Sequence, residues 1–239
     1  MADWDRFSED YDRIFFENPQ YVDTLERMAA HAAAARGVRV LDLGCGTGNV
    51  TATLLEKAGD AGLEIVAIDP STGMREKCLT RFAGEAAVKV REGDALAVPA
   101  VDLEFDYIFT NLTLHHVPPE QRAGCAGELA RVLAPGGTLV YGDMFCDVDS
   151  DPRDPARVKD IVDKMVGVAL FCLDQGAFDM MNVVLSSLPA DVTGEGEYLT
   201  TSDVWKGILE EAGFVDLEVQ GVPPVEFGVK IITGRKAAG

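Results

Sequence analysis

The feature that most constrains the fold is an alternation of strand-like and helix-like segments between residues 38 and 144. The strand-like runs are VRVLDLG, LEIVAID, VKVREGD, FDYIFTN and TLVYGDM. The segments between them include GNVTATLLEKAG, STGMREKCLTRF and PPEQRAGCAGELARVLAPGG, the last predicted to be a helix closed by a Pro-Gly-Gly turn. Strands that alternate with helices form right-handed crossover units. We therefore expect an α/β fold with a doubly wound, mainly parallel sheet.

The last part of the chain adds two strands with a different connection. VDLEVQGV and VEFGVKIIT are separated by only a few residues around Pro223 and Pro224. A parallel crossover needs a dozen residues or more, so this short link requires an antiparallel hairpin. The prediction is a seven-stranded, mainly parallel sheet with an antiparallel C-terminal hairpin.

Two helical segments lie outside this alternation. Residues 1–36 are predicted to form two helices, the first with aromatic side chains at helical spacing. Residues 147–199 begin with an acidic, proline-rich loop, continue as mostly helical sequence over 156–188, and end in a loop that contains ADVTGEGEY. We predict three units: an N-terminal helical unit (1–36), a sheet domain (37–146 and 200–239) and a helical cap insertion (147–199).

A glycine-rich loop follows the first predicted strand and opens the next helix. Its glycines are Gly44, Gly46 and Gly48, and Asp69 ends the second predicted strand. Glycine lets the backbone approach a ligand closely, and a carboxylate placed like Asp69 typically accepts hydrogen bonds from ribose. A dinucleotide site wants G-x-G-x-x-G, and here the third glycine comes one place early. Asp42 suits an ammonium group, so a nucleoside that carries an amino acid is favoured. A glycine turn that serves packing alone is the simpler alternative.

Charge and cysteine content limit the class of partner. The chain has 40 acidic against 21 basic residues, a formal net charge of -19. Such a surface repels nucleic acid and anionic membranes, and the longest apolar-leaning stretch (161–173) is too short to span a bilayer. Five cysteines without a CxxC pair indicate neither a disulfide framework nor a zinc site, and the acidic N-terminus lacks a signal-peptide pattern. We expect a cytoplasmic protein, monomeric or homodimeric, that binds a small molecule and has no nucleic-acid partner, no membrane partner and no metal.

Several motifs together resemble those of class I S-adenosylmethionine-dependent methyltransferases. VLDLGCGTG and AIDPS are similar to the first two motifs of this family, REGDAL to the third, and FDYIFTNLTLHHVP with ELARVLAPGGTLVYGD to the fourth and fifth. The similarity is greatest to the group that includes the ubiquinone and menaquinone biosynthesis enzymes and many small-molecule methyltransferases. It covers residues 4–144 and the C-terminus, whereas 147–199 matches no known pattern. The resemblance implies a Rossmann-like methyltransferase fold, with S-adenosyl-L-methionine as cofactor and S-adenosyl-L-homocysteine as product.

The resemblance also implies roles for individual residues. The three loop glycines would shape the backbone against the methionine part of the cofactor, with Asp42 near its amino group. Asp69 would bind the ribose diol, Met74 would pack near the adenine, and Asp94 would accept a hydrogen bond from the adenine amine. Ordinary core packing for Met74 and a turn cap for Asp94 are the alternatives. The full set of implied cofactor contacts is Tyr11, Asp42, Gly44, Cys45, Gly46, Gly48, Asp69, Pro70, Met74, Asp94, Ala95, Asn111 and Leu112.

Candidate catalytic residues lie in two places. Methyl transfer from a sulfonium is an in-line displacement that needs no metal, and it needs a base only where the nucleophile must lose a proton. His115 and His116 follow the fourth predicted strand; one of them could serve as a base, or both could pack and hydrogen-bond. In similar enzymes the N-terminal helix covers the cofactor as a lid, which would bring Tyr11 to the sulfonium and Trp4 to the substrate. Packing of that helix on the core would explain the same spacing.

The cap supplies further candidate substrate contacts. Asp143, at the end of the fifth predicted strand, would orient a substrate hydroxyl or amine, and Met165 and Phe171 belong to the Met- and Phe-rich face of the cap. Such a face is more often core than binding wall, although the underside of a cap can be both. We therefore predict a small, partly apolar acceptor that is methylated at oxygen, nitrogen or carbon.

Three other functions are compatible with the same sequence. A same-fold enzyme that uses a carboxylated cofactor would need an extra cation, for which Arg153 or Arg157 is placed near the start of the cap. A non-catalytic regulatory protein would bind the cofactor without turnover. A nicotinamide oxidoreductase would bind NAD(H) instead.

Overall fold

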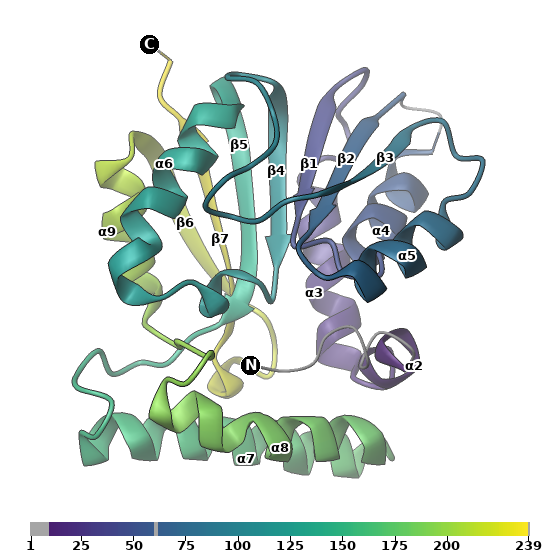
Figure 1. The fold of residues 1–239 in the computed structure, drawn as a ribbon. Helices are drawn as coiled ribbons and strands as arrows, with labels where there is room; N and C mark the ends of the chain where they lie inside the picture. The colour runs from purple at the N-terminus through teal and green to yellow at the C-terminus, as the bar shows by residue number, and fades with distance from the viewer. Residues whose placement is uncertain (1–9, 60–61, 239) are drawn as a thin grey trace.

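The protein, described here from a computed structural model, forms one seven-stranded sheet with helices on both faces (Figure 1). The structure describes residues 10–59 and 62–238. The strand order is β3-β2-β1-β4-β5-β7-β6. The strands β1 to β5 pair in parallel, whereas β7 pairs antiparallel with both β5 and β6. The predicted doubly wound sheet and its antiparallel C-terminal hairpin are confirmed.

The elements follow one another along the chain in the expected alternation. The strands are β1 (Arg39–Leu43), β2 (Glu64–Asp69), β3 (Val88–Glu92), β4 (Phe105–Asn111), β5 (Leu133–Met144), β6 (Phe214–Gly221) and β7 (Val229–Lys236). The helices are α2 (Tyr11–Phe15), α3 (Pro19–Ala30), α4 (Asn49–Ala58), α5 (Thr72–Arg81), α6 (Arg122–Val132), α7 (Pro155–Asp174), α8 (Phe178–Thr193) and α9 (Ser202–Glu211). Three short 3-10 turns are η1 (Leu114–His116), η2 (Pro119–Gln121) and η3 (Val225–Phe227).

The two faces of the sheet bury separate apolar clusters. Side chains alternate across a strand, so Val40 of β1 packs with α3 and α4, whereas Leu41 and Leu43 pack with α6 and α9 on the opposite face. The α7–α8 pair lies below the carboxyl ends of the strands in Figure 1, away from both faces. Its buried side chains, among them Met165 and Met180, join the cluster of α3 and α4. The α7–α8 pair therefore forms a third layer, which lies at the carboxyl ends of the strands.

Capping residues explain where several helices begin. Asn18 and Asp154 each accept a backbone N–H and are each followed by proline, which suits the first helical position. Ser71 caps α5, as predicted, by accepting the N–H of Met74 at 3.2 Å. Thr201 caps α9 by accepting the N–H of Val204 at 3.2 Å. The polar residue before each helix thus satisfies a backbone donor that the helix leaves free.

Three predicted boundaries are wrong. The Pro-Gly-Gly turn lies inside β5, which begins at Leu133 and runs through an irregular stretch before regular pairing resumes at Thr138. The last strand begins at Val229 rather than at Val225, because η3 precedes it. The helix α8 does not stop before Pro189 but continues through Thr193 to Gly194, which has a left-handed φ of +69°. Proline disfavours a helix interior, yet the additional turn buries Asp191.

The segment predicted as a cap contains α7 and α8 and lies between β5 and α9. The helical character predicted for 156–188 agrees with these helices, whereas the proposed division of the chain into three units stays a prediction. No helix within 10–59 or 62–238 has both the length and the apolar character needed to cross a membrane.

Candidate functional site

The loops that follow β1, β2 and β4 meet at the carboxyl edge of the sheet. The strand order reverses direction between β1 and β4, and ligands of open α/β sheets bind at such a position. A cavity of about 100 Å³ lies here and is called the loop cavity below. It is lined by Tyr11, Gly44, Gly46, Asp69, Pro70, Ser71, Met74, Asn111, Leu112, Thr113 and His116.

The glycine loop has a backbone conformation that requires glycine. Gly44 has a φ of +70°, and a Cβ at this position would lie 2.3 Å from the Thr113 side chain. Its N–H donates to the carbonyl oxygen of Ile68 at 2.8 Å, which fixes the loop to β2. Around Gly46 the nearest atom to an added Cβ is Met74 Sδ at 3.9 Å, so the backbone there borders open space. The loop can therefore receive a ligand against its main chain.

Asp69 holds the glycine loop and also faces the loop cavity. Its Oδ2 accepts the N–H of Gly46 and its Oδ1 accepts the N–H of Ser71, each at 2.8 Å. Burial raises the pKa of Asp69, an effect that these two N–H donors oppose. A carboxylate offers about four acceptor positions, so each oxygen keeps capacity for one more donor. This arrangement suits a vicinal diol.

The helix α2 is tied to the glycine loop through one carboxylate. Asp12 Oδ1 accepts hydrogen bonds from Thr47 Oγ1 and from Asn49 Nδ2, the latter at 3.0 Å. The same Asn49 amide also donates to Tyr21 of α3 at 3.1 Å. These bonds place Tyr11 between the two cavities of the site, where its ring stacks on Phe15 with centroids 4.2 Å apart.

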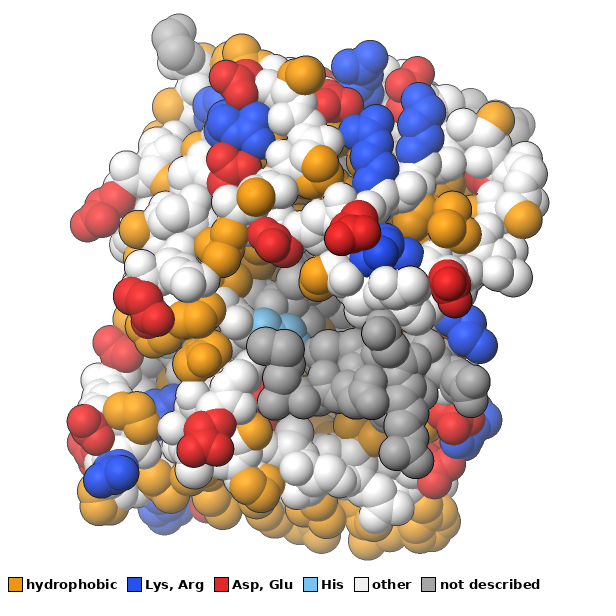
Figure 2. Space-filling view, viewed as in Figure 1, with side chains coloured by type: hydrophobic (Ala, Val, Ile, Leu, Met, Phe, Trp, Pro, Cys, Tyr) orange, Lys and Arg blue, Asp and Glu red, His pale blue; other side chains and the backbone are white. Residues whose placement is uncertain are grey.

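A second cavity of about 170 Å³ adjoins the first and is called the cap cavity below. Its walls come from α2, α3, α7, α8 and the ends of β4 and β5, and Tyr11, Asn111 and Leu112 border both cavities. Its lining consists of Tyr11, Phe15, Asn18, Gln20, Tyr21, Thr24, Asn111, Leu112, His115, Met144, Met165, Val168, Met180, Val183, Val184, Ser187, Asp191, Glu197, Leu199 and Val229. In Figure 2 histidine side chains are visible in a hollow between the upper part of the molecule and the α7–α8 layer.

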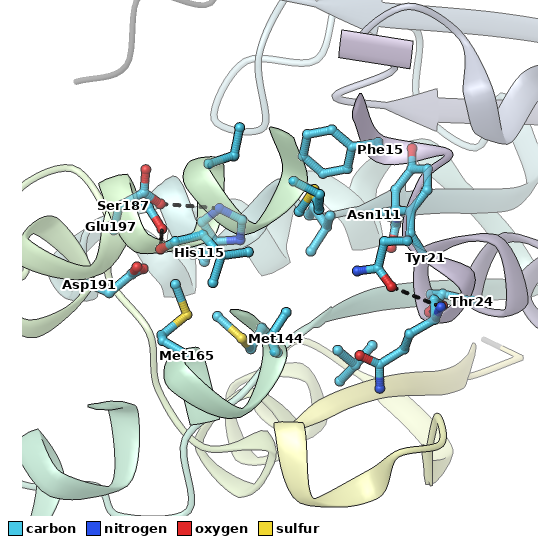
Figure 3. A pocket seen from close by; sticks show the side chains of 18 of the residues that line it. Phe15, Tyr21, Thr24, Asn111, His115, Met144, Met165, Ser187, Asp191 and Glu197 are labelled. Atoms are coloured by element: carbon cyan, nitrogen blue, oxygen red, sulfur yellow. Dashed lines mark hydrogen bonds and ion pairs between the residues drawn. The ribbon is translucent and has the colours of Figure 1, made fainter. Parts of the chain in front are cut away.

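The cap cavity has one polar end. Figure 3 shows His115, Ser187, Asp191 and Glu197 together on one side, with Phe15, Tyr21 and Thr24 on the other. This acidic end, as we call it, contains two carboxyl groups in the lining, and the described lining includes no lysine or arginine. The other walls are mainly aliphatic, aromatic and thioether side chains. A ligand of the cavity therefore meets an apolar surface with an acidic end.

His115 lies between two carboxylates. Its Nδ1 is 2.6 Å from Asp143 Oδ1, and its Nε2 is 3.2 Å from Glu197 Oε2. Asp143 is fully buried, and Tyr141 donates its hydroxyl to Asp143 Oδ2 at 3.0 Å. Burial lowers the pKa of His115, but Asp143 and Glu197 outweigh this and raise it well above 6.5. Both ring nitrogens of His115 are therefore engaged by carboxylates, which favour the protonated form of the ring.

Glu197 and Asp191 ionise in different pH ranges although they share this end of the cavity. Burial raises the pKa of Glu197, but hydrogen bonds from His115 and His116 lower it to about 2. Burial raises the pKa of Asp191 to about 6. Glu197 is therefore a permanent carboxylate at neutral pH, whereas Asp191 exchanges a proton close to it.

One group of side chains has the geometry for a metal ion. His115, His116 and Glu197 offer ligand atoms that all lie within 4.8 Å of one another. The Nδ1 of His115 faces Asp143, as it often does in metal-ligating histidines, but the Nδ1 of His116 also lies 3.0 Å from the carbonyl oxygen of Gly196. A hydrogen bond to that carbonyl would make this nitrogen unavailable as a metal ligand. The expectation of a metal-free site stays a prediction.

The structure brings most predicted cofactor residues to the loop cavity but not all. Those lining it are Tyr11, Gly44, Gly46, Asp69, Pro70, Met74, Asn111 and Leu112. The described lining does not include Asp42, Cys45, Gly48, Asp94 or Ala95. Asp94 is exposed and accepts the N–H groups of Leu96 and Ala97, so it caps a turn. Cys45 packs with Cys78, and Gly48 is the residue before α4, with a φ of +88° and beside Phe82.

Some of the predicted substrate and catalytic residues line a cavity, and others do not. His115 and Met165 line the cap cavity, and His116 lines the loop cavity. Asp143 lies behind His115 instead of in either described lining. Phe171 packs on Phe227 with ring centroids 5.6 Å apart and does not reach the described lining. Trp4 lies outside the described residues.

Sequence reasoning missed several residues of the site. Ser71 and Thr113 line the loop cavity, and Ser187, Asp191 and Glu197 line the cap cavity. The first two directly follow strands β2 and β4, a position that was a usable signal. The other three lie in the predicted cap insertion, for which no sequence motif suggested a role, and Asp191 falls in the stretch predicted as a loop. Only the tertiary packing that brings α8 and the loop after it to the cap cavity identifies them.

Replacing Glu197 with glutamine tests the pairing of His115. The variant lacks one of the two carboxylates that raise the His115 pKa, so we expect this pKa to fall. A raised histidine pKa stabilises the fold below the unfolded value, and this contribution disappears as the pH rises through the folded pKa. In the variant this stabilising contribution of His115 should disappear at a lower pH than in the original protein. Imidazole NMR signals followed against pH measure the shift, exposed His31 serves as an internal control, and an unchanged His115 curve would contradict the pairing.

Comparison with known proteins identifies the class to which this fold and pair of cavities belong. A family model described as a methyltransferase domain matches residues 40–137. The chain is 31% identical over 238 residues to the demethylmenaquinone methyltransferase of Staphylococcus aureus, covering 93% of this chain and 89% of the relative. It belongs to the class I S-adenosylmethionine-dependent methyltransferase family, which confirms the resemblance, and it is an S-adenosylmethionine-dependent methyltransferase.

Two further comparisons agree with this family and fold. The chain is 26% identical over 215 residues to an uncharacterized methyltransferase of Geobacillus kaustophilus, covering 88% of this chain and 86% of the relative. Among solved structures it superposes with a TM-score of 0.69, at 16% identity and over 99% of both chains, on a chain of the complex between the Haloferax volcanii Trm112 methyltransferase activator and a putative methyltransferase. At this identity the superposition shows the fold alone.

Proposed function

We propose that this enzyme methylates a small, partly apolar acceptor held in the cap cavity, with S-adenosyl-L-methionine held in the loop cavity. The observation that carries the proposal is the shared border of the two cavities at Tyr11, Asn111 and Leu112. An in-line displacement needs donor and acceptor on opposite sides of one point. Two adjoining cavities, one beside the glycine loop and one under the cap, provide such a point.

The residues of the loop cavity fit the cofactor. Asp69 retains acceptor capacity on both oxygens for a ribose diol, and the Gly46 backbone borders open space. Asn111 Oδ1 is buried without a hydrogen-bond partner among the described residues, so it can accept from an ammonium group. Met74 offers an apolar contact for a nucleobase. Bound here, S-adenosyl-L-methionine supplies an electrophilic methyl group.

The chain's own contribution is positioning and exclusion of water. We infer that Tyr11 covers the border of the two cavities, since the Asp12 contacts hold α2 against the glycine loop. We assign His115 a positioning role rather than that of a base, because carboxylates already engage both of its ring nitrogens. His116 borders the loop cavity and is proposed as a cofactor contact.

The structure favours the methyltransferase function over the carboxylated-cofactor alternative. That alternative needs a guanidinium beside the cofactor, and neither Arg153 nor Arg157 belongs to the described lining of either cavity. Arg153 is exposed, and buried Arg157 donates to the carbonyl oxygen of Leu199 at 3.1 Å. A cationic contact for a cofactor carboxylate therefore does not come from these residues.

Two measurements test the proposal. Calorimetric titration of the purified protein with S-adenosyl-L-homocysteine should show one site per chain. Mass spectrometry after incubation with S-adenosyl-L-methionine and candidate acceptors should detect a methylated product. If S-adenosyl-L-homocysteine does not bind, the cofactor assignment is refuted. Binding without turnover across a broad acceptor set would favour a regulatory protein.

Removal of metal ions should leave turnover unchanged. The displacement itself needs no Lewis acid, and His115 is engaged by carboxylates on both nitrogens. Turnover before and after dialysis against a chelator, with a metal analysis of the protein, measures the effect. Stoichiometric metal that is lost from a His115→Ala variant but not from His31→Ala, together with lost turnover, would establish a metal site instead.

A further inference from the structure

The acidic end of the cap cavity contains a carboxyl group with one unsatisfied oxygen, although Ser187 hydrogen-bonds this carboxyl group and lowers its pKa. Asp191 is 3% exposed, and its Oδ2 has no hydrogen-bond partner among the residues that the structure describes. A buried carboxylate oxygen without a donor is costly, and such an atom in a cavity lining is typically completed by a ligand. Because Asp191 lines the cap cavity, the missing donor is expected to belong to the molecule held there.

The charges around Asp191 select the type of donor. Glu197, His115 and His116 act on it electrostatically, and Asp143 lies behind His115. Three carboxylates face two imidazoles, so the group keeps a negative charge even if both imidazoles are protonated. An acceptor that reacts as an anion, such as a phenolate or carboxylate, would be repelled here. An amine gains positive charge at nitrogen as it is methylated, and this charge is stabilised by the carboxylates.

We propose that the methyl acceptor is a small amine with an apolar body, and that Asp191 binds its nitrogen and takes up one of its protons. This inference rests on the function proposed above and specifies its substrate class. The apolar walls formed by Met144, Met165 and Val184 contact the body of the molecule. Glu197, held by two histidines, remains a carboxylate opposite the nitrogen.

The two carboxyl groups have separate tasks. An ammonium group is not a nucleophile, so one proton must leave before the nitrogen can attack. Burial makes Asp191 the more basic of the pair, with a pKa of about 6, and so the group that accepts this proton. In the balanced step the nitrogen forms a bond to the methyl carbon while the carbon–sulfur bond breaks and sulfur keeps the electron pair. Nitrogen becomes positive again, Asp191 carries the proton, and the total charge is unchanged.

Paired ligands test the proposal by binding rather than by turnover. The probes are phenyl-substituted primary amines from benzylamine to 4-phenylbutylamine, each with its matching alcohol, titrated calorimetrically into the protein saturated with S-adenosyl-L-homocysteine. At least one amine should bind about tenfold more tightly than its alcohol, because only the amine offers a charge-assisted donor. In Asp191→Asn this preference should disappear while the alcohol binds as before. Asp174→Asn, at the exposed end of α7, should leave the preference intact.

The outcomes separate this inference from the proposed function. If no amine binds more tightly than its alcohol, or if the preference survives in Asp191→Asn, the amine assignment is wrong. If S-adenosyl-L-homocysteine itself does not bind, the proposed function fails first. Thermal unfolding of Asp191→Asn is the folding control. Burial raises the pKa of Asp191 and so disfavours its charge, which asparagine does not carry, so the variant should stay folded at neutral pH and a lost preference reports the missing carboxylate.

Discussion

Replacement of Asp69 with alanine is expected to weaken S-adenosyl-L-homocysteine binding about hundredfold. The side chain lines the loop cavity, and each of its oxygens has already accepted one backbone N–H, from Gly46 or Ser71. A ribose diol would use the remaining acceptor positions. Loss of two charge-assisted hydrogen bonds, worth about 1.5 kcal/mol each at the lower end, removes about 3 kcal/mol of binding free energy. Calorimetric titration measures this change directly.

Glu92 provides the matched control for this substitution. It lies opposite Asp69 in the register of β2 and β3, but its side chain is 78% exposed and pairs with Arg75. Glu92→Gln should bind S-adenosyl-L-homocysteine as the original protein does. Because Asp69 also anchors Gly46, thermal unfolding of the unliganded Asp69→Ala protein must accompany the titration. A folded variant with unchanged affinity would show that Asp69 does not contact the ribose.

Replacement of Asp42 with asparagine is expected to remove much of the pH dependence of stability between pH 4 and 7. Asp42 is fully buried, its Oδ2 accepts the backbone N–H and the hydroxyl of Thr51, and its Oδ1 has no partner among the described residues. Burial raises its pKa to about 7, against which the Thr51 bonds act only partly. The carboxyl group therefore accepts a proton more readily in the folded than in the unfolded state.

The sign of this effect follows from proton linkage. Where the folded state binds more protons, the free energy of unfolding falls as the pH rises, here from near the unfolded pKa up to about pH 7. The difference of about 3 pKa units corresponds to about 4 kcal/mol, as an order of magnitude. Asparagine cannot ionise, so the variant should lose this part of the slope. Asp191, with a pKa of about 6, contributes a slope of the same sign that remains.

Urea unfolding of both proteins at several pH values between 4 and 8 measures this difference. The free energy of unfolding of the asparagine variant should rise relative to that of the original protein as the pH increases to about 7. Above pH 7 the difference between the two should stay constant. Parallel curves would mean that Asp42 is as acidic in the folded protein as in the unfolded chain. Binding of S-adenosyl-L-homocysteine to the variant also tests the implied role of Asp42 near the cofactor amino group.

Much of the sheet domain was predictable because its signals are local. The spacing of apolar runs determines the alternation of strand and helix, and the short link before β7 allows only an antiparallel pairing. Gly44 and Gly46 both have a positive φ, and a Cβ at Gly44 would collide with the Thr113 side chain. The boundaries that were wrong, at β5 and α8, depend on neighbours that are distant in sequence. At α8 the helix continues through Pro189, although proline disfavours the interior of a helix.

The sequence by itself determined the fold class, the enzyme family and the position of Asp69 beside the glycine loop, because each depends on short motifs between a strand and the helix after it. Tertiary structure decided the rest of the site. Asp94 caps a turn and Asp42 is buried, although both were equally plausible contacts from their motifs. The acidic end of the cap cavity joins residues from η1, α8 and the loop after it. Burial and charge pairing arise only when these segments pack together, and they shift the pKa values of His115, Glu197 and Asp191 in different directions or to different extents.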